Sequence, residues 1–126
     1  MRFYNDKINK YFFNPKHSGV LNRKLSNVYS VEQGNLKLGK LIHFQIMLDD
    51  TKSYIKDVKY KAYGCGVTIA TLEWLSESII NKDISILDNI KLEDVNSSLE
   101  LPSNKLHCAL TIEDILKKFK SLIISK

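Results

Sequence analysis

The chain has 126 residues, the length of one ordinary domain, and its hydrophobic fraction of 44% is enough for a packed core. No stretch of about 18 apolar residues is present, so we expect no membrane-spanning helix and no membrane partner. The net charge of +5 comes from scattered basic residues. A nucleic-acid binder needs a basic patch, so we rank that function far behind and expect no nucleic-acid partner. The first residues lack the apolar core of a signal peptide, which predicts a cytoplasmic protein.

The N-terminal third of the chain predicts a short helix, a turn and a first strand. The helix spans about residues 5–13, with Asn5 or Asp6 as its cap. The Asn14-Pro15 pair ends it, because the residue before a proline disfavours helical geometry. A turn follows in "NPKHSG". Residues 25–33 have an ambiguous pattern, and we interpret them as a strand.

A hairpin comes next in the chain. Apolar residues alternate with their neighbours from Ile42 to Leu48, and a second alternating run follows from Asp57 to Ala62. The polar segment "DDTKS" lies between the two runs. Two amphipathic strands joined by a short polar turn predict an antiparallel pair.

The remaining chain is predicted to be helical. Residues 67–81 are apolar on nearly all sides, which predicts a helix buried on more than one face. Short helices are expected within residues 84–99, with Asp83 as a candidate cap, and a regular amphipathic helix is expected over residues 112–123. Strands followed by helices predict a single α+β domain over residues 1–126, a small, mainly antiparallel three-stranded sheet with helices on one face.

Cys65 is one of two cysteines and lies between two glycines, where the second hairpin strand is expected to become helix. A thiol directly before a helix faces unpaired backbone N–H groups and the positive end of the helix dipole. Both stabilise the thiolate, which binds metal or attacks sulfur. The glycines would permit a positive φ and leave the thiol accessible. A buried cysteine at a tight turn explains this motif alone equally well.

His107 and Cys108 are adjacent in sequence and are both good ligands for zinc or for iron–sulfur chemistry. Adjacent side chains diverge by about 100° on a regular helix, so they could share a metal only at an irregular position such as a helix start. Pro102, shortly upstream, makes such a start plausible. The alternative is a coincidence of two ordinary residues. His17, in the first turn, is expected to have a surface role.

Three segments in order carry a resemblance to a known family. They are "YNDKINKYFFNPKHSG", "VKYKAYGCGVTIAT" and "LELPSNKLHCALTIEDILKKF". Together they resemble the IscU/NifU-type iron–sulfur cluster assembly scaffolds over nearly the whole chain. The resemblance implies an α+β domain with its site at one end of the sheet. It also implies a scaffold that is not itself an enzyme.

Such scaffolds take sulfur from a cysteine desulfurase and iron from a donor. They build a [2Fe-2S] cluster and pass it to recipient apo-proteins. Carried over by motif, the ligands of iron or the cluster would be Cys65, Cys108 and the neighbouring His107. The resemblance implies that Cys108 accepts the sulfur. Leu101, Pro102 and Lys105 match part of the motif that an Hsp70-type chaperone binds. Ser103 and Asn104 depart from that motif, which puts chaperone docking in doubt.

The first cysteine of the family's site is missing from this sequence. In the matching segment "LKLGKL", Leu38 stands at the cysteine position and Lys40 at the position of a nearby aspartate, while Gly39 is retained. His43 is a poor substitute, because the strand pleat would point it to the opposite face. A protonated Lys40 cannot bind iron. It would repel a cation and stabilise nearby thiolates or an anionic cluster.

Two functions therefore remain open. The first is a working scaffold whose missing ligand comes from an outside thiol or a second subunit. The second is a degenerate relative that binds zinc through Cys65, His107, Cys108 and a water. In a variant of the second, the chain binds a desulfurase as a regulator without building a cluster.

Overall fold

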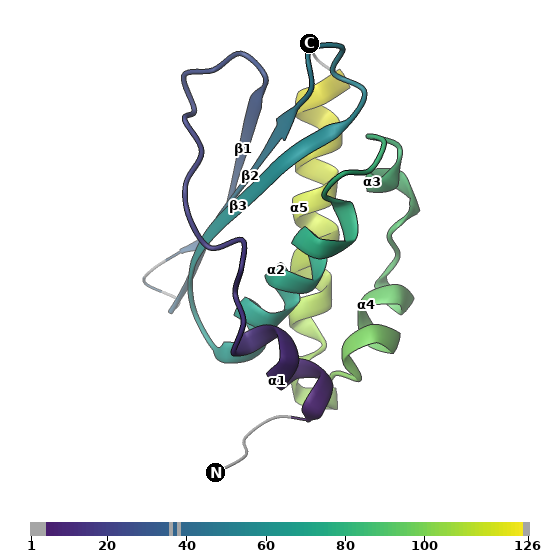
Figure 1. The fold of residues 1–126 in the computed structure, drawn as a ribbon. Helices are drawn as coiled ribbons and strands as arrows, with labels where there is room; N and C mark the ends of the chain where they lie inside the picture. The colour runs from purple at the N-terminus through teal and green to yellow at the C-terminus, as the bar shows by residue number, and fades with distance from the viewer. Residues whose placement is uncertain (1–4, 36, 38, 125–126) are drawn as a thin grey trace.

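The computed structural model describes residues 5–35, 37 and 39–124, so Leu38 lies outside the described part of the chain. A sheet forms one layer, and the helices lie together on one of its faces (Figure 1). None of the helices in the described residues combines the length and the apolar character needed to cross a bilayer.

The first helix, α1, spans Asp6–Phe12, as the sequence predicted. Asn5 is its cap, because the side-chain oxygen accepts a hydrogen bond from the backbone N–H of Ile8 at 2.8 Å. The side-chain nitrogen of Asn5 donates to the backbone oxygens of Leu99 and Glu100. This one side chain therefore starts the helix and also ties it to a segment 94 residues away.

Three antiparallel strands form the sheet in the order β1-β2-β3, with bounds Val28–Asn35, Lys40–Leu48 and Ile55–Tyr63. The predicted hairpin is β2 and β3. The predicted first strand over residues 25–33 is displaced, because β1 begins and ends later. Its last residue, Asn35, pairs with Lys40 at the start of β2. Cross-strand pairing therefore extends β1 through Gly34 and Asn35, two residue types with low strand propensity.

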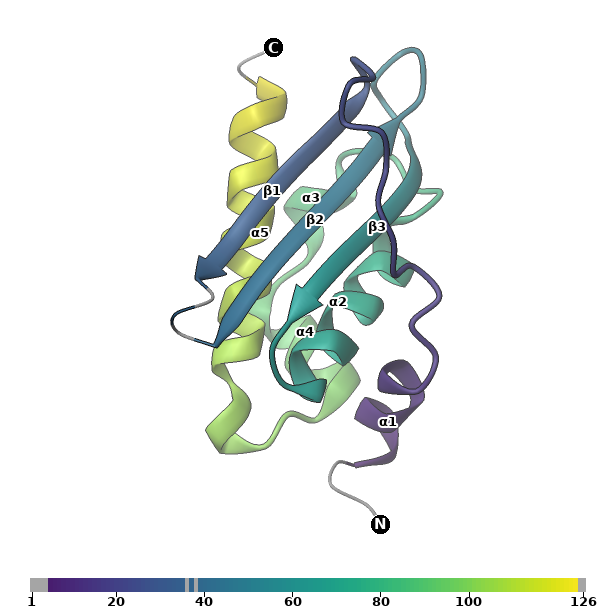
Figure 2. The ribbon, with the colours of Figure 1, turned by 90° about the vertical axis from the view of Figure 1, so that its left-hand side faces the viewer.

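The two faces of the sheet are covered differently. On the inner face, the alternating residues Ile42, Phe44, Ile46 and Leu48 of β2 are fully buried under the helices. On the outer face, Gln45 is buried, and its amide oxygen accepts a hydrogen bond from the Leu21 backbone N–H at 2.7 Å. The segment between α1 and β1 thus crosses the outer face after running along β3 (Figure 2).

The helical layer follows in chain order as α2 (Gly66–Ile79), α3 (Ile86–Asn89), α4 (Leu92–Leu99) and α5 (His107–Ile124), with a 3-10 turn over Ser103–Lys105 before α5. Helix α2 is buried along most of its length, as predicted. Helix α5 begins five residues earlier than expected and therefore includes His107 and Cys108. Asp83 is not the cap residue of α3, which is Ser85, but it accepts a hydrogen bond from the Ser85 N–H. The α+β fold class is confirmed.

Candidate functional site

Strand β3 ends, and helices α2 and α5 begin, at one end of the sheet (Figure 2). The two cysteines meet there through a shared contact with Thr68. Cys65 is the cap residue of α2, with an extended backbone (φ −79°, ψ 163°). Cys108 is the second residue of α5. The fold therefore joins two residues that are 43 positions apart in the sequence. Cys65 is half-buried, whereas Cys108 is only 1% exposed.

Thr68 links the two thiols. Its hydroxyl lies 3.4 Å from the Cys65 sulfur and 3.7 Å from the Cys108 sulfur, and the residue itself is buried. The sequence interpretation missed Thr68, although the spacing contained a signal. The third residue of a helix faces back toward the cap residue, so a hydroxyl at this position can hydrogen-bond to the Cys65 side chain.

The two thiols have opposite pKa shifts. Burial raises the pKa of Cys65, but hydrogen bonds from Thr68 and the charge of Lys105 outweigh it, so that the pKa falls below its usual value. For Cys108, burial dominates and raises the pKa. The hydrogen bond from Thr68 and the charge of Lys40 lower it, while the charge of Cys65 and a hydrogen bond with it add to the rise. The lower pKa gives Cys65 the larger thiolate fraction of the two at neutral pH.

The flanking glycines do not adopt the positive φ that the sequence analysis allowed for them. Among the described residues the positive φ angles of glycine fall at Gly19, Gly34 and Gly39, and not at Gly64 or Gly66. A Cβ added to Gly64 would lie 3.6 Å from the Lys40 side chain, which is an ordinary contact. The extended backbone of Cys65 is sufficient to start the helix, so no left-handed residue is needed here.

His107 lies at an irregular position, as a shared site would require. It is the first residue of α5, directly after the 3-10 turn, and its side chain is exposed. The structure does not bring it into a metal-binding group with the two cysteines. Within the described residues, no three His, Cys, Asp or Glu side chains are placed to hold a metal ion. In this part of the chain, the ligand set expected for iron and the same set expected for zinc are therefore both not preassembled.

Lys40 provides a cation beside the thiols. It is the first residue of β2, and its ammonium donates to the Thr111 hydroxyl at 2.8 Å. That hydroxyl in turn donates to the backbone oxygen of His107 at 3.0 Å. The Lys40 side chain also passes beside Gly64. The ammonium is thus fixed between the residue before Cys65 and the first turn of α5.

The segment predicted to bind a chaperone directly precedes α5. Leu101 is buried in the core, Pro102 is exposed, and Lys105 is half-buried in the 3-10 turn. The side chain of Leu101 is therefore not available to a partner in this conformation. Lys105 instead contributes its charge to the Cys65 environment.

The two remaining histidines lie away from the thiols. The Nε2 atom of His43 is 3.0 Å from the Arg23 guanidinium, on the outer face as expected. His17 does not have the predicted surface role. Its ring is 15% exposed and lies 2.7 Å from the fully buried carboxylate of Glu73. Tyr60 donates to the same carboxylate at 3.0 Å. The overlooked signal was Glu73, a glutamate between apolar residues in a helix predicted to be buried, since buried carboxylates need partners.

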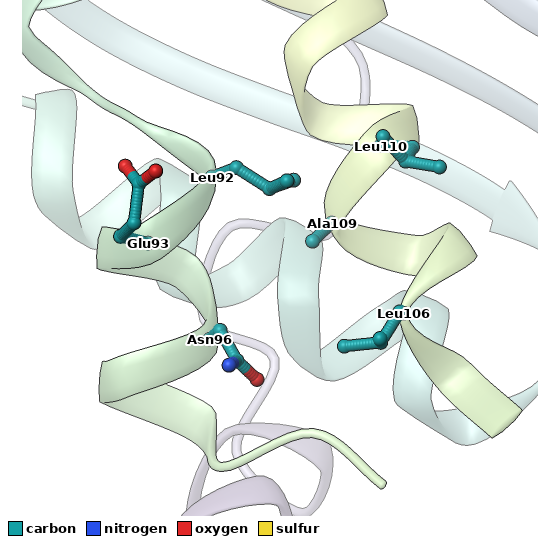
Figure 3. Close-up of a pocket in the computed structure, with 6 residues that line it drawn as sticks. All are labelled: Leu92, Glu93, Asn96, Leu106, Ala109 and Leu110. Atoms are coloured by element: carbon teal, nitrogen blue, oxygen red, sulfur yellow. The ribbon is translucent and has the colours of Figure 1, made fainter. Parts of the chain in front are cut away.

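An apolar pocket of about 300 Å³ opens between α4 and α5 (Figure 3). Its lining residues are Leu92, Glu93, Asn96, Leu106, Ala109 and Leu110. It includes neither thiol, although Leu106 and Ala109 flank His107 and Cys108 in sequence. This pocket is therefore separate from the sulfur atoms.

Comparison with known proteins gives relatives that are similar in sequence and a solved structure that has the same fold. The chain is 34% identical over 116 residues to iron sulfur cluster assembly protein 1, mitochondrial, of Eremothecium gossypii, covering 92% of this chain and 75% of the relative. It is 35% identical over 114 residues to the iron-sulfur cluster assembly scaffold protein IscU of Haemophilus influenzae, covering 90% of both. The crystal structure of a protein from Fervidobacterium islandicum AW-1, described as an iron-sulfur cluster assembly scaffold for the SUF system, has the same fold. Its TM-score is 0.65 at 20% identity, over 90% of this chain and 93% of that one.

These comparisons correct the predicted location. The Eremothecium relative is a mitochondrial protein, which contradicts the expectation of a cytoplasmic one. Hydropathy and charge at the start of a sequence were an insufficient basis for assigning a compartment.

The family itself is shown by a match over most of the sequence. Residues 3–121 match the family of NifU-like N terminal domains, which includes both thiols, Lys40 and all three strands. Together with the fold and the two relatives above 30% identity, this match establishes that the chain belongs to the NifU-like N-terminal domain family.

Proposed function

We propose that this protein is an iron–sulfur cluster assembly scaffold, a carrier on which sulfur and iron are combined and then passed to recipient apo-proteins. The observation that carries the proposal is the meeting of Cys65 and Cys108 across the Thr68 hydroxyl at one end of the sheet. The names of the relatives from Eremothecium and Haemophilus support it. In this account residues 1–126 act as one domain, and the protein is a carrier rather than an enzyme.

The cluster is cargo, and the chain itself supplies too few ligands to hold it alone. Cys65 and Cys108 would bind iron through sulfur, and His107 would add a nitrogen if its exposed side chain turned toward them. A [2Fe-2S] cluster has four ligands. We infer that the fourth comes from an outside thiol or a second subunit, since Lys40 cannot coordinate iron while it is protonated.

The partners follow from the chemistry. A cysteine desulfurase would supply sulfur, with Cys108 as the residue that holds it, and apo-proteins would receive the cluster. An Hsp70-type chaperone is the partner with the weakest support, because Ser103 and Asn104 depart from its motif and Leu101 is buried in the core. Only Pro102 and Lys105 of the matching residues lie outside the core. Zinc binding through Cys65, His107 and Cys108 is the weaker alternative, because it needs the same rearrangement of His107 without any support from the relatives' names.

Anaerobic assembly tests the proposal. The purified chain is mixed with ferrous iron, cysteine and a cysteine desulfurase, with and without an added small thiol. We expect visible absorption of a [2Fe-2S] cluster that disappears when an apo-ferredoxin is added and acquires the cluster. The proposal is wrong if no absorption develops under any thiol condition while a control scaffold assembles its cluster in parallel.

A further inference from the structure

The two thiols differ in accessibility, and this difference sets an order in which they can react. Cys65 is half-buried, whereas Cys108 is 1% exposed and lies behind it in the core. A sulfur donor arriving from solvent therefore meets Cys65 first. Cys108, which the proposed function treats as the residue that holds sulfur, presents almost no surface to such a donor.

We propose that Cys65 is the entry point for sulfur and that it passes a sulfur atom inward to Cys108. This inference rests on the proposed function and adds an internal transfer step to it. Its geometric basis is the Thr68 hydroxyl, which lies 3.4 Å from one sulfur and 3.7 Å from the other. Both thiols thus contact the same small buried hydroxyl.

The transfer consists of two thiol exchanges. First, the Cys65 thiolate attacks a sulfane sulfur of the donor, a persulfide or a polysulfide. A bond forms between the Cys65 sulfur and the sulfane sulfur, and the donor leaves with the electron pair of the broken S–S bond. The product is a Cys65 persulfide.

In the second exchange, the Cys108 sulfur attacks the outer sulfur of the Cys65 persulfide. The new bond joins Cys108 to the outer sulfur, and the bond from that sulfur to Cys65 breaks. The electron pair remains on Cys65, and the proton lost by Cys108 ends there. The Thr68 hydroxyl can accept the proton from one sulfur and donate its own to the other. No oxidant or reductant is consumed.

Lys40 explains why the sulfur would remain on Cys108. A persulfide is readily ionised, and an anion is stabilised by a nearby cation. The Lys40 ammonium is held against the first turn of α5 by its 2.8 Å hydrogen bond to Thr111, one turn beyond Cys108. The Lys40 charge acts to lower the pKa of the Cys108 thiol, against the larger rise that burial causes. Lys40 is thus a positioning residue for the transferred sulfur.

The test uses inorganic polysulfide as donor and needs neither desulfurase nor iron, so its failure is separable from failure of scaffold function. The folded chain is exposed to polysulfide for varied times and then alkylated. Peptide mass spectrometry reports the persulfide on each cysteine. We expect the label on Cys65 first and on Cys108 later. In Cys65→Ser, persulfide formation at Cys108 should slow by about tenfold or more, whereas in Cys108→Ser the label should accumulate on Cys65.

Two further variants test the role of Thr68 in the second exchange and the role of Lys40 in retaining the sulfur on Cys108. Thr68→Val should slow the second exchange and leave the first intact. Lys40→Met should shorten the lifetime of the Cys108 persulfide several-fold, while Lys56→Met, which removes an exposed lysine from β3, should not. Circular dichroism of each variant confirms that the fold is kept.

Three results would overturn the proposal. One is labelling of Cys108 at the wild-type rate in Cys65→Ser. Another is simultaneous labelling of both cysteines in the native chain. The third is a Cys65–Cys108 disulfide with release of sulfide, which would mean that Cys108 attacks the inner sulfur instead of the outer one.

Discussion

Helix α2 carries two buried polar clusters, and they are built in opposite ways. In the middle of the helix, the Glu73 carboxylate accepts hydrogen bonds from the His17 backbone, the His17 ring and the Tyr60 hydroxyl at 2.7 to 3.0 Å. At its N-terminal end, Thr68 meets two sulfur atoms at 3.4 and 3.7 Å. Oxygen and nitrogen partners surround the first cluster, while weakly hydrogen-bonding thiols form the second.

The difference separates a structural role from a chemical one. A buried carboxylate with three donors is fully satisfied and resists rearrangement. Thiols form weak hydrogen bonds and can therefore exchange Thr68 for another partner at little cost. The Glu73 cluster fixes the segment after α1 against β3 and α2. The thiol cluster remains available for sulfur or metal. The following changes test this division, from the largest expected effect to the smallest.

Glu73→Ala should cost the most stability. It leaves the His17 N–H and the Tyr60 hydroxyl buried without their acceptor, and breaking such a buried network costs about 3–5 kcal/mol. Urea unfolding measures the loss. Glu113→Ala is the control, because it removes an exposed carboxylate 3.9 Å from Lys117 and should change the unfolding free energy by less than about 0.5 kcal/mol. Similar losses in both variants would contradict a structural role for Glu73.

Tyr60→Phe should weaken the same cluster more gently. It deletes one hydrogen bond to a charged acceptor and leaves the ring stacked on Phe44. We expect a loss of about 1.5–3 kcal/mol in urea unfolding. Alkylation rates of both cysteines should be unchanged under native conditions. A large change in those rates would mean that the two clusters of α2 are coupled.

The thiols should differ in reactivity with iodoacetamide. Cys65 is the more exposed and its pKa is lowered, so we expect it to react at least about tenfold faster than the buried Cys108 near neutral pH. In Thr68→Val, the pKa of Cys65 should rise, which shifts its pH–rate profile to higher pH. Equal rates for the two cysteines, or a profile that Thr68→Val leaves in place, would count against the assigned geometry.

Glu77 should give the smallest effect. Its pKa is raised by burial and then by a hydrogen bond with Glu73 and the charge of that residue. A carboxyl whose pKa is higher in the folded state stabilises the fold below its unfolded pKa of about 4.3, and this contribution is lost as the pH rises through the folded value. Wild-type stability should therefore fall more than that of Glu77→Gln as the pH rises from about 4 to 7. Parallel stability curves would refute the shift.

Local patterns predicted much of the fold. Proline and asparagine marked the ends of α1, alternation identified β2 and β3, and the change of period at Gly66 located the start of α2. The early start of α5 was missed because His107 and Cys108 follow a 3-10 turn whose irregular geometry has no periodic signature.

The site was only partly predictable. Cys65 and Cys108 followed from their motifs, but the position of Thr68 between them depends on two helices meeting in space. The same holds for Lys40 and Thr111, which are 71 residues apart. The cluster of His17, Tyr60 and Glu73 likewise combines three distant segments. A local pattern could indicate that Glu73 needs partners, but it could not identify them.

The most direct measurement is anaerobic cluster assembly compared across three chains: the native protein, the Cys65→Ser/Cys108→Ser double variant and Tyr60→Phe. We expect full visible absorption of the cluster for the native protein and for Tyr60→Phe, and none for the double variant, with all three chains folded. Assembly that survives in the double variant would contradict the claim that these two thiols carry the function.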